Sequence, residues 1–260
     1  MRNTLAERLL VRIMDWSPEE IDIQRPLLQA LANFKLNDYQ QFSPGIRFIE
    51  SLVKWLQQFE TFQEKRTAYG LVINHLIFIS GEQIAHLVNL LFSEKINPIL
   101  IKKTAEEIAQ SKYSVNQIVN SDKYDANLKM SLFIGMSDGS KIDQFRRAAG
   151  LNNEQVYPTY QINSTKASDM LSKLQKKVKE GKFKTIFLVD DFTASGKSYC
   201  RPEDNEGQGA GKLFNFFDEL FKGSDGLNKI VDFENLELHV LFYIASEDAL
   251  NNIKDDLLCG

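Results

Sequence analysis

From residue 74 onward, short apolar runs alternate with amphipathic stretches, and this alternation limits the folds available to the chain. The apolar runs contain few polar residues, as is typical of strands covered on both faces. They are His75–Ser80, Asn97–Ile101, Ser131–Met136, Thr185–Asp190 and Leu236–Ala245. The segments between them with helical spacing are Glu82–Phe92, Thr165–Lys179 and Lys212–Phe221. The pattern predicts an α/β fold with a mainly parallel, doubly wound sheet.

The first 73 residues differ, because the apolar patterns in them are helical. Leu5, Leu9 and Ile13 recur every four residues. Ser17 is followed by Pro18 and, three residues on, by Glu20, which is the signature of a helix start. Further helices are expected around residues 49–59 and 63–74. We therefore expect a helical N-terminal extension, residues 1–73, and an α/β core, residues 74–260. The extension either caps the sheet or serves as a specificity or dimerisation module.

The composition is that of an ordinary globular protein, with 43% apolar and 25% charged residues. The 31 basic and 35 acidic residues give a net charge of −4, so we do not expect direct nucleic-acid binding. The two cysteines, Cys200 and Cys259, form no CxxC pair, which argues against a structural zinc site and for a reducing compartment. No apolar stretch of about 18 residues is evident, so we expect a cytoplasmic protein without membrane contact.

The most informative stretch follows the apolar run at Thr185–Asp190. The run ends in two acidic residues, Asp190 and Asp191, and a loop of small residues comes next. The loop consists of Thr193, Ala194, Ser195, Gly196, Lys197 and Ser198. Paired carboxylates must face solvent, a cation or a polyol, because unpaired buried charge is costly. A small-residue loop can surround an anion with its amides and hydroxyls. Together the two features predict a sugar-phosphate site.

This stretch, VDDFTASGKS, resembles the ribose-phosphate signature of the type I phosphoribosyltransferases. The resemblance implies that Asp190 and Asp191 bind the ribose hydroxyls of phosphoribosyl pyrophosphate and that Thr193–Ser198 holds its 5′-phosphate. It also implies Mg²⁺ as the cofactor, near Asp190 and Asp191. Catalysis of that kind depends on positioning the ribose and stabilising the leaving pyrophosphate. The sequence identifies no individual catalytic residue.

The wider chain resembles phosphoribosyltransferase-like proteins that are encoded with bacterial conflict and antiphage systems, some beside retron reverse transcriptases. Three stretches carry this resemblance: HLIFISGEQIAHLVNLL, GMSDGSKIDQFRRAAGLNNEQV and FKTIFLVDDFTASGKSY. The resemblance implies an effector of defence, or its regulator, that works with other proteins of a defence operon.

Two strand-to-helix turns are candidates for the pyrophosphate loop that the resemblance implies. One is Ile79–Glu82, in which Glu82 opposes an anion but is suited to capping its helix. The other contains Ser137, Asp138, Gly139 and Ser140 and is followed by Lys141, Arg146 and Arg147. We favour the second turn, because its basic residues supply charge for pyrophosphate.

Two further interpretations of the loop stay open. Gly196, Lys197 and Ser198 match the end of a P-loop, but that pattern requires glycine where this chain has Asp191. In addition, the segment from Tyr199 to Gly211 contains Pro202 and several glycines, so no long helix follows the loop. We therefore expect a phosphoribosyltransferase-like protein that binds a ribose phosphate; the alternatives are a catalytically inactive nucleotide sensor of the same fold, an NTPase, or a simple acidic turn after a core strand without a ligand.

Other polar features are expected to be structural. The lysines between Lys166 and Lys184 lie mostly opposite an apolar stripe, as on a solvated helix face. His75, His86 and His239 lack the spacing of metal ligands. Cys200 has no base at a recognisable spacing, so we do not expect a nucleophile there.

Overall fold

The computed structural model describes residues 3–34, 37, 47–201, 210–222 and 226–259. The chain divides into two compact units, Met1–Ala85 and His86–Gly260. The boundary that the sequence suggested, after residue 73, falls inside a helix of the first unit.

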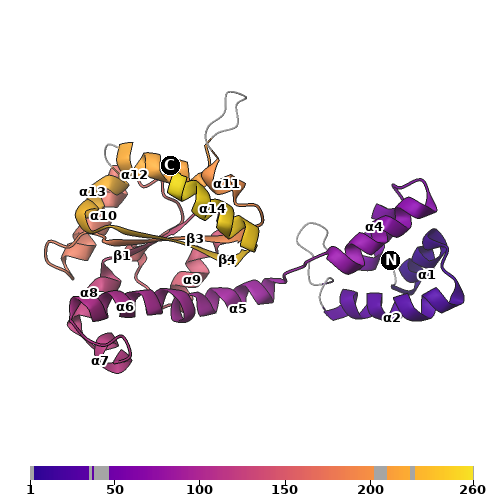
Figure 1. Cartoon of the computed structure of the whole chain (residues 1–260), viewed down its shortest axis with the longest axis horizontal. Helices are drawn as coiled ribbons and strands as arrows, with labels where there is room; N and C mark the ends of the chain where they lie inside the picture. Colours follow the sequence, from indigo (N-terminus) through magenta and orange to yellow (C-terminus); the bar gives the residue numbers. More distant parts are fainter. Residues whose placement is uncertain (1–2, 35–36, 38–46, 202–209, 223–225, 260) are drawn as a thin grey trace. The chain divides into compact units, whose positions relative to one another are not determined.

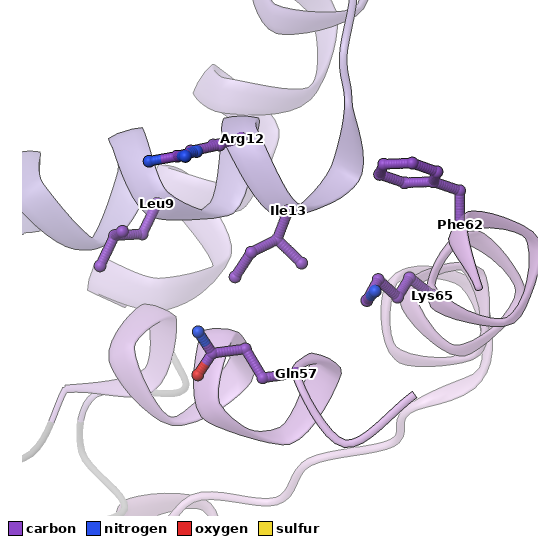
Figure 2. Close-up of a pocket in the computed structure, with 6 residues that line it drawn as sticks. All are labelled: Leu9, Arg12, Ile13, Gln57, Phe62 and Lys65. Atoms are coloured by element: carbon purple, nitrogen blue, oxygen red, sulfur yellow. The ribbon is translucent and has the colours of Figure 1, made fainter. Parts of the chain in front are cut away.

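The first unit is helical. Its helices are α1 (Asn3–Met14), α2 (Pro18–Phe34), α3 (Phe48–Leu56) and α4 (Phe62–His75). The expected start of α2 is confirmed: Ser17 and Glu20 each accept a hydrogen bond from the other's backbone amide, at 3.2 and 2.9 Å. The core of this unit includes Leu10 and Met14 of α1, which are almost fully buried. A hollow of about 370 Å³ lies between α1, α3 and α4, with Arg12 and Lys65 at its rim (Figure 2).

The second unit contains the sheet and most of the helices. Its N-terminal part has α5 (Gly81–Leu91), which begins in the first unit, the π-helical turn η2 (Phe92–Ile96), α6 (Asn97–Glu107), α7 (Val115–Val119), α8 (Asp122–Lys129), β1 (Ser131–Gly135), η3 (Asp138–Ser140) and α9 (Ile142–Ala148). Then come η4 (Asn153–Gln155), β2 (Val156–Tyr157), α10 (Ser164–Gln175), β3 (Thr185–Thr193), α11 (Lys197–Cys200), α12 (Lys212–Lys222), α13 (Leu227–Ile230), η5 (Phe233–Asn235), β4 (Glu237–Ala245) and α14 (Glu247–Cys259).

The four strands form a wholly parallel sheet in the order β2-β1-β3-β4. Helices α10, α12 and α14 cover one face, and α6, α8 and α9 cover the other (Figure 1). Alternate residues of the strands serve the two faces. Leu132 and Ile186 join the core beneath α10 and α12, whereas Phe133 stacks on Phe187 at 5.2 Å and packs against Phe145 of α9. The predicted doubly wound α/β fold is confirmed.

Two of the five predicted strands are wrong. Asn97–Ile101 forms the first turn and a half of α6, where Pro98 occupies a position that favours a helix start. Residues 76–80 run without pairing to any strand, and Ile77 is 84% exposed. A strand needs a neighbour to satisfy its backbone groups, and this segment lies in the first unit, outside the four-stranded sheet. The edge strand β2 was not predicted, because its two residues are too few to show a periodic pattern.

One helix corrects the expectation that no segment could span a membrane. Helices α5 and α6 are continuous through η2, and Gly81–Glu107 is the one helix in the described part of the chain long and apolar enough to do so. The most apolar 18 residues have a mean hydropathy of 1.2, and 22% of that window is buried. Core helices of soluble proteins meet the same criterion, and Val88, Ile96 and Leu100 on this helix are fully buried.

Candidate functional site

β1 ends at Gly135, which pairs in parallel with Val189, so the turn after β1 lies beside residues 190–193, the last four residues of β3. The turn after β1 and the turn after β3 therefore start at the same edge of the sheet. Ligands of open α/β sheets bind at this edge. The favoured anion turn, residues 137–140, and the acidic pair are brought together in this way.

Contacts between the two turns are close. The Ser137 hydroxyl donates a hydrogen bond to Asp190 Oδ1. Gly139 lies directly against the other acid: a Cβ atom there would overlap the Asp191 carboxylate, at 2.6 Å from Cγ. A side chain at position 139 would therefore displace that carboxylate. The phenol of Tyr243, on β4, donates to the Ser140 carbonyl at 2.9 Å and fixes the far end of the turn.

Asp190 is fully buried and bonded only to protein donors. Besides the Ser137 hydroxyl, these are the Asp191 amide at 3.0 Å, the Tyr199 hydroxyl at 2.5 Å and Lys212 Nζ at 2.6 Å. Burial raises the pKa of this carboxyl, but hydrogen bonds from Lys212, Ser137 and Tyr199 outweigh burial and hold the pKa below its ordinary value. Asp190 is therefore a carboxylate, and it is turned away from solvent.

Asp191 has the opposite environment. It is half-buried, and Oδ1 accepts a hydrogen bond from the Phe192 amide at 2.8 Å. Its Oδ2 is the atom that a Cβ at Gly139 would meet first. Of the two acids, Asp191 is the one that a ligand can reach.

Four residues at the end of β3 and in the loop after it are buried or held through their backbone. Thr193 is buried, and its hydroxyl accepts from the Gly196 amide at 3.2 Å. Gly196 has a φ of 75°, and a Cβ there would lie 2.8 Å from the Ala249 carbonyl, so only glycine fits. The Ala194 carbonyl accepts a hydrogen bond from the Ser246 hydroxyl, just before α14, at 2.5 Å, and the Ser195 carbonyl accepts one from Asn252 Nδ2 on α14 at 2.9 Å.

The remaining loop side chains face solvent. Ser195, Lys197 and Ser198 are exposed. They supply two hydroxyls and one ammonium group at the edge of the sheet. The predicted phosphate loop thus separates into residues that hold its shape and residues that face a ligand.

A segment interrupts the chain after this loop, as the sequence indicated. Helix α11 has a single turn, Lys197–Cys200. Residues 202–209 lie outside the described residues, but the ends of the segment are joined by a hydrogen bond of 2.7 Å from the Gly211 amide to the Arg201 carbonyl. Lys212 follows at once and reaches Asp190. Tyr199 and Lys212 were not among the predicted site residues, since both belong to elements whose spatial position the sequence does not reveal.

An open hollow of about 370 Å³ adjoins the turn after β1. It is lined by Ser137, Asp138, Ser140, Lys141, Ile142, Asp143, Gln144, Arg147 and Pro158. The exposed basic residues there are Lys141 and Arg147. Arg146, also predicted as a site residue, is half-buried and does not line the hollow. Its Nε lies 3.9 Å from Asp143 Oδ1.

The other candidate turn, Ile79–Glu82, belongs to the first unit. There Ser80 and Gln83 form a reciprocal cap at the start of α5, with bonds of 3.2 and 3.0 Å. The capping residue is thus Gln83 rather than Glu82.

The sequence model of the PRTase-CE family, a phosphoribosyltransferase-like family, matches residues 52–258. This chain belongs to the PRTase-CE family. No curated protein and no solved structure matches it. The match includes the whole second unit except its last two residues, and with it both turns of the site.

The residues of this PRTase-CE chain do not fit a magnesium ion held by the protein. Both oxygens of Asp190 are occupied by protein donors, which leaves Asp191 as the single available carboxylate of the pair. Within the described ranges, no group of three or more His, Cys, Asp or Glu residues is placed to hold a metal. Mg²⁺ prefers several oxygen ligands and often takes them from phosphates.

Other polar residues of the PRTase-CE chain have structural surroundings. His239 stacks on Phe187 at 5.1 Å, and burial lowers its pKa. Burial raises the pKa of the Cys200 thiol, which makes it a poor nucleophile. Lys166 and Lys173 pair with Asp169 on the surface of α10.

Proposed function

We propose that this protein binds phosphoribosyl pyrophosphate, or a related ribose phosphate, where β1 and β3 end. The observation that carries the proposal is that one reachable carboxylate, Asp191, lies against Gly139 of the turn after β1 and shortly precedes the loop after β3, and that both segments bear hydroxyls and cations. A sugar phosphate requires an acceptor for its hydroxyls and donors for its anionic groups, and these lie together here.

Each part of the ligand has a matching group. Asp191 would accept hydrogen bonds from the ribose hydroxyls. The exposed Ser195, Lys197 and Ser198 would bind the 5′-phosphate. Lys141 and Arg147, beside the turn after β1, would bind the pyrophosphate. This arrangement supports transfer of ribosyl phosphate by positioning and charge stabilisation, without a covalent nucleophile.

We place this activity in bacterial antiphage defence, as an effector acting with other proteins of its operon. The support is the likeness of three stretches of the chain to proteins of conflict systems. Family membership supports the phosphoribosyltransferase-like domain.

A second candidate is a sensor that binds the ligand without turnover. The observation that favours it is the single turn of α11, because a longer helix after the loop would add its dipole to anion binding. The NTPase alternative is weaker, since Asp191 stands where a P-loop requires glycine.

Calorimetric titration with phosphoribosyl pyrophosphate and Mg²⁺, with ATP as the comparison ligand, tests the proposal. We expect micromolar binding of the first ligand and its loss in Asp191→Asn. The same substitution at exposed Asp125, on α8, is the matched control and should bind as the wild type does. Release of pyrophosphate with a bound acceptor would favour the transferase over the sensor. Binding of ATP alone would overturn the proposal in favour of the NTPase.

A further inference from the structure

Asp190 has no acceptor position left for a ligand. A carboxylate offers about four lone-pair sites, two on each oxygen. Oδ1 accepts from the Ser137 hydroxyl and the Asp191 amide, and Oδ2 accepts from the Tyr199 hydroxyl and Lys212 Nζ. All four donors belong to the protein. A sugar hydroxyl could bind Asp190 only by displacing one of them.

Lys212 is the counter-ion that allows this acid to stay charged. The Asp190 side chain is fully buried, whereas the Lys212 side chain is 33% exposed, and their charged atoms are 2.6 Å apart. The ammonium group also lies over the Tyr199 ring, 4.9 Å from its centroid. A buried carboxylate that loses its partner is strongly destabilising. The position of Asp190 therefore depends on Lys212.

The contacts of Asp190 explain what it does for the site. Through Oδ1 it ties the turn after β1, at Ser137, to the backbone of Asp191. This tie places Gly139 against the second carboxylate. Asp190 thus holds the two segments together from the protein interior, whereas Asp191 stays accessible to solvent.

We propose that the two acids have separate roles: Asp190, paired with Lys212, is an internal anchor that does not touch the sugar, and Asp191 alone binds its hydroxyls. Lys212 is then the counter-ion of this anchor and contacts no ligand. The assignment to a sugar rests on the proposed function, whereas the anchoring pair does not.

A double-mutant cycle on the full chain tests this division. The variants are Lys212→Met, Asp190→Asn and the two combined, with Asp191→Asn and Lys212→Arg for comparison. Each is measured by urea unfolding and by titration with phosphoribosyl pyrophosphate and Mg²⁺. Asparagine keeps an acceptor oxygen for Ser137 and Asp191, and its amide can donate to the Tyr199 oxygen.

We expect Lys212→Met to lower the urea midpoint most, and the combined variant to recover most of that loss because no buried charge is left alone. Lys212→Arg should stay near the wild type. The combined variant should keep its affinity within about threefold, whereas Asp191→Asn should lose at least about tenfold, the loss of one charge-assisted hydrogen bond.

Three results would overturn parts of this assignment. A folded combined variant that loses affinity as far as Asp191→Asn does would mean that Asp190 contacts the sugar. A Lys212→Met variant as stable as the wild type would remove the anchoring pair. If the wild type binds no ribose phosphate, the proposed function fails, and the stability cycle alone still decides whether Lys212 and Asp190 act together.

Discussion

The segment 190–199, from the end of β3 to α11, contains two sets of residues that are interleaved along the chain but have opposite surroundings. The buried set holds the turn in shape and comprises Asp190, Thr193, Gly196 and Tyr199. The accessible set comprises Asp191, Ser195, Lys197 and Ser198. A ten-residue motif therefore combines a scaffold with a binding surface. Substitutions in the buried set should cost mainly stability, and substitutions in the accessible set mainly affinity.

The largest effect on affinity is expected from Gly139→Ala. The new Cβ would overlap the Asp191 carboxylate, whose short side chain has to turn away. Losing that carboxylate from the site should lower the affinity for phosphoribosyl pyrophosphate by about 10- to 150-fold, the equivalent of one hydrogen bond to a charged group. Calorimetry would measure the loss, and the urea midpoint should change little.

The same substitution in a chain that lacks the Asp191 carboxylate tests this prediction more strictly. In an Asp191→Ala chain, Gly139→Ala should have almost no further effect on affinity, because the atom it displaces is gone. Additive losses in the double variant would instead mean that the backbone of the turn has moved.

Tyr199→Phe should have the converse effect. It removes one donor from the buried Asp190 carboxylate, which should lower the free energy of unfolding by about 1–3 kcal/mol. Affinity should change less than about threefold. Tyr113→Phe, on a side chain that is 83% exposed, is the matched control and should stay within about 0.5 kcal/mol of the wild type. A loss of affinity without a loss of stability would place Tyr199 in the accessible set.

Lowering the pH should reduce the stability that the buried set contributes to the fold. The pKa of Asp190 is lowered in the folded chain, so this group stabilises the fold above its unfolded pKa of about 3.9 and loses that contribution as the pH falls through the folded value. The free energy of unfolding, measured by urea at pH 6, 4 and 3, should thus fall further in the wild type than in the combined Asp190→Asn and Lys212→Met variant. Parallel curves would contradict the prediction.

Lys197→Ala should have the smallest effect. The side chain is exposed, so its removal should leave the free energy of unfolding within about 0.5 kcal/mol. Loss of one ammonium group near a phosphate should weaken binding by about three- to tenfold, roughly the value of a surface ion pair. Lys222→Ala, at an exposed position on α12, is the control. Loss of ATP hydrolysis in Lys197→Ala would instead point to a P-loop.

The fold was predictable where a buried strand has distinct ends. Thr185–Asp190 and Ser131–Met136 are apolar runs that stop at polar residues, and both form strands, although β3 continues three residues beyond the predicted end, to Thr193, and β1 ends one residue earlier, at Gly135. The similar run at Asn97–Ile101 is helical, because a run of five residues fits either structure. Ile96, Leu100 and Thr104 recur at the spacing of a helix and are fully buried, a signal that extends beyond the run itself.

The site was predictable only in part, for a related reason. The two acids and the turn at residues 137–140 can be found because each comes at the carboxyl end of an apolar run, and the carboxyl ends of parallel strands meet at one edge; the acids themselves belong to β3. Which acid is buried depends on Lys212 and Tyr199, and these approach from helices on either side of residues 202–209. Nothing in the local sequence reveals that approach. The sequence motif predicts which residues form the site, but the role of each residue depends on how it packs in the folded chain.

The close approach of Gly139 to Asp191 also constrains how the two positions can evolve. Positions 139 and 191 are fifty-two residues apart in the chain but share one small volume. A lineage that gains a side chain at 139 must reposition or lose the carboxylate at 191, whereas a lineage that has lost the carboxylate is free to vary at 139. Among descendants of a common ancestor, the two positions should change together, and a glycine kept at 139 should mark the members that still use the acid.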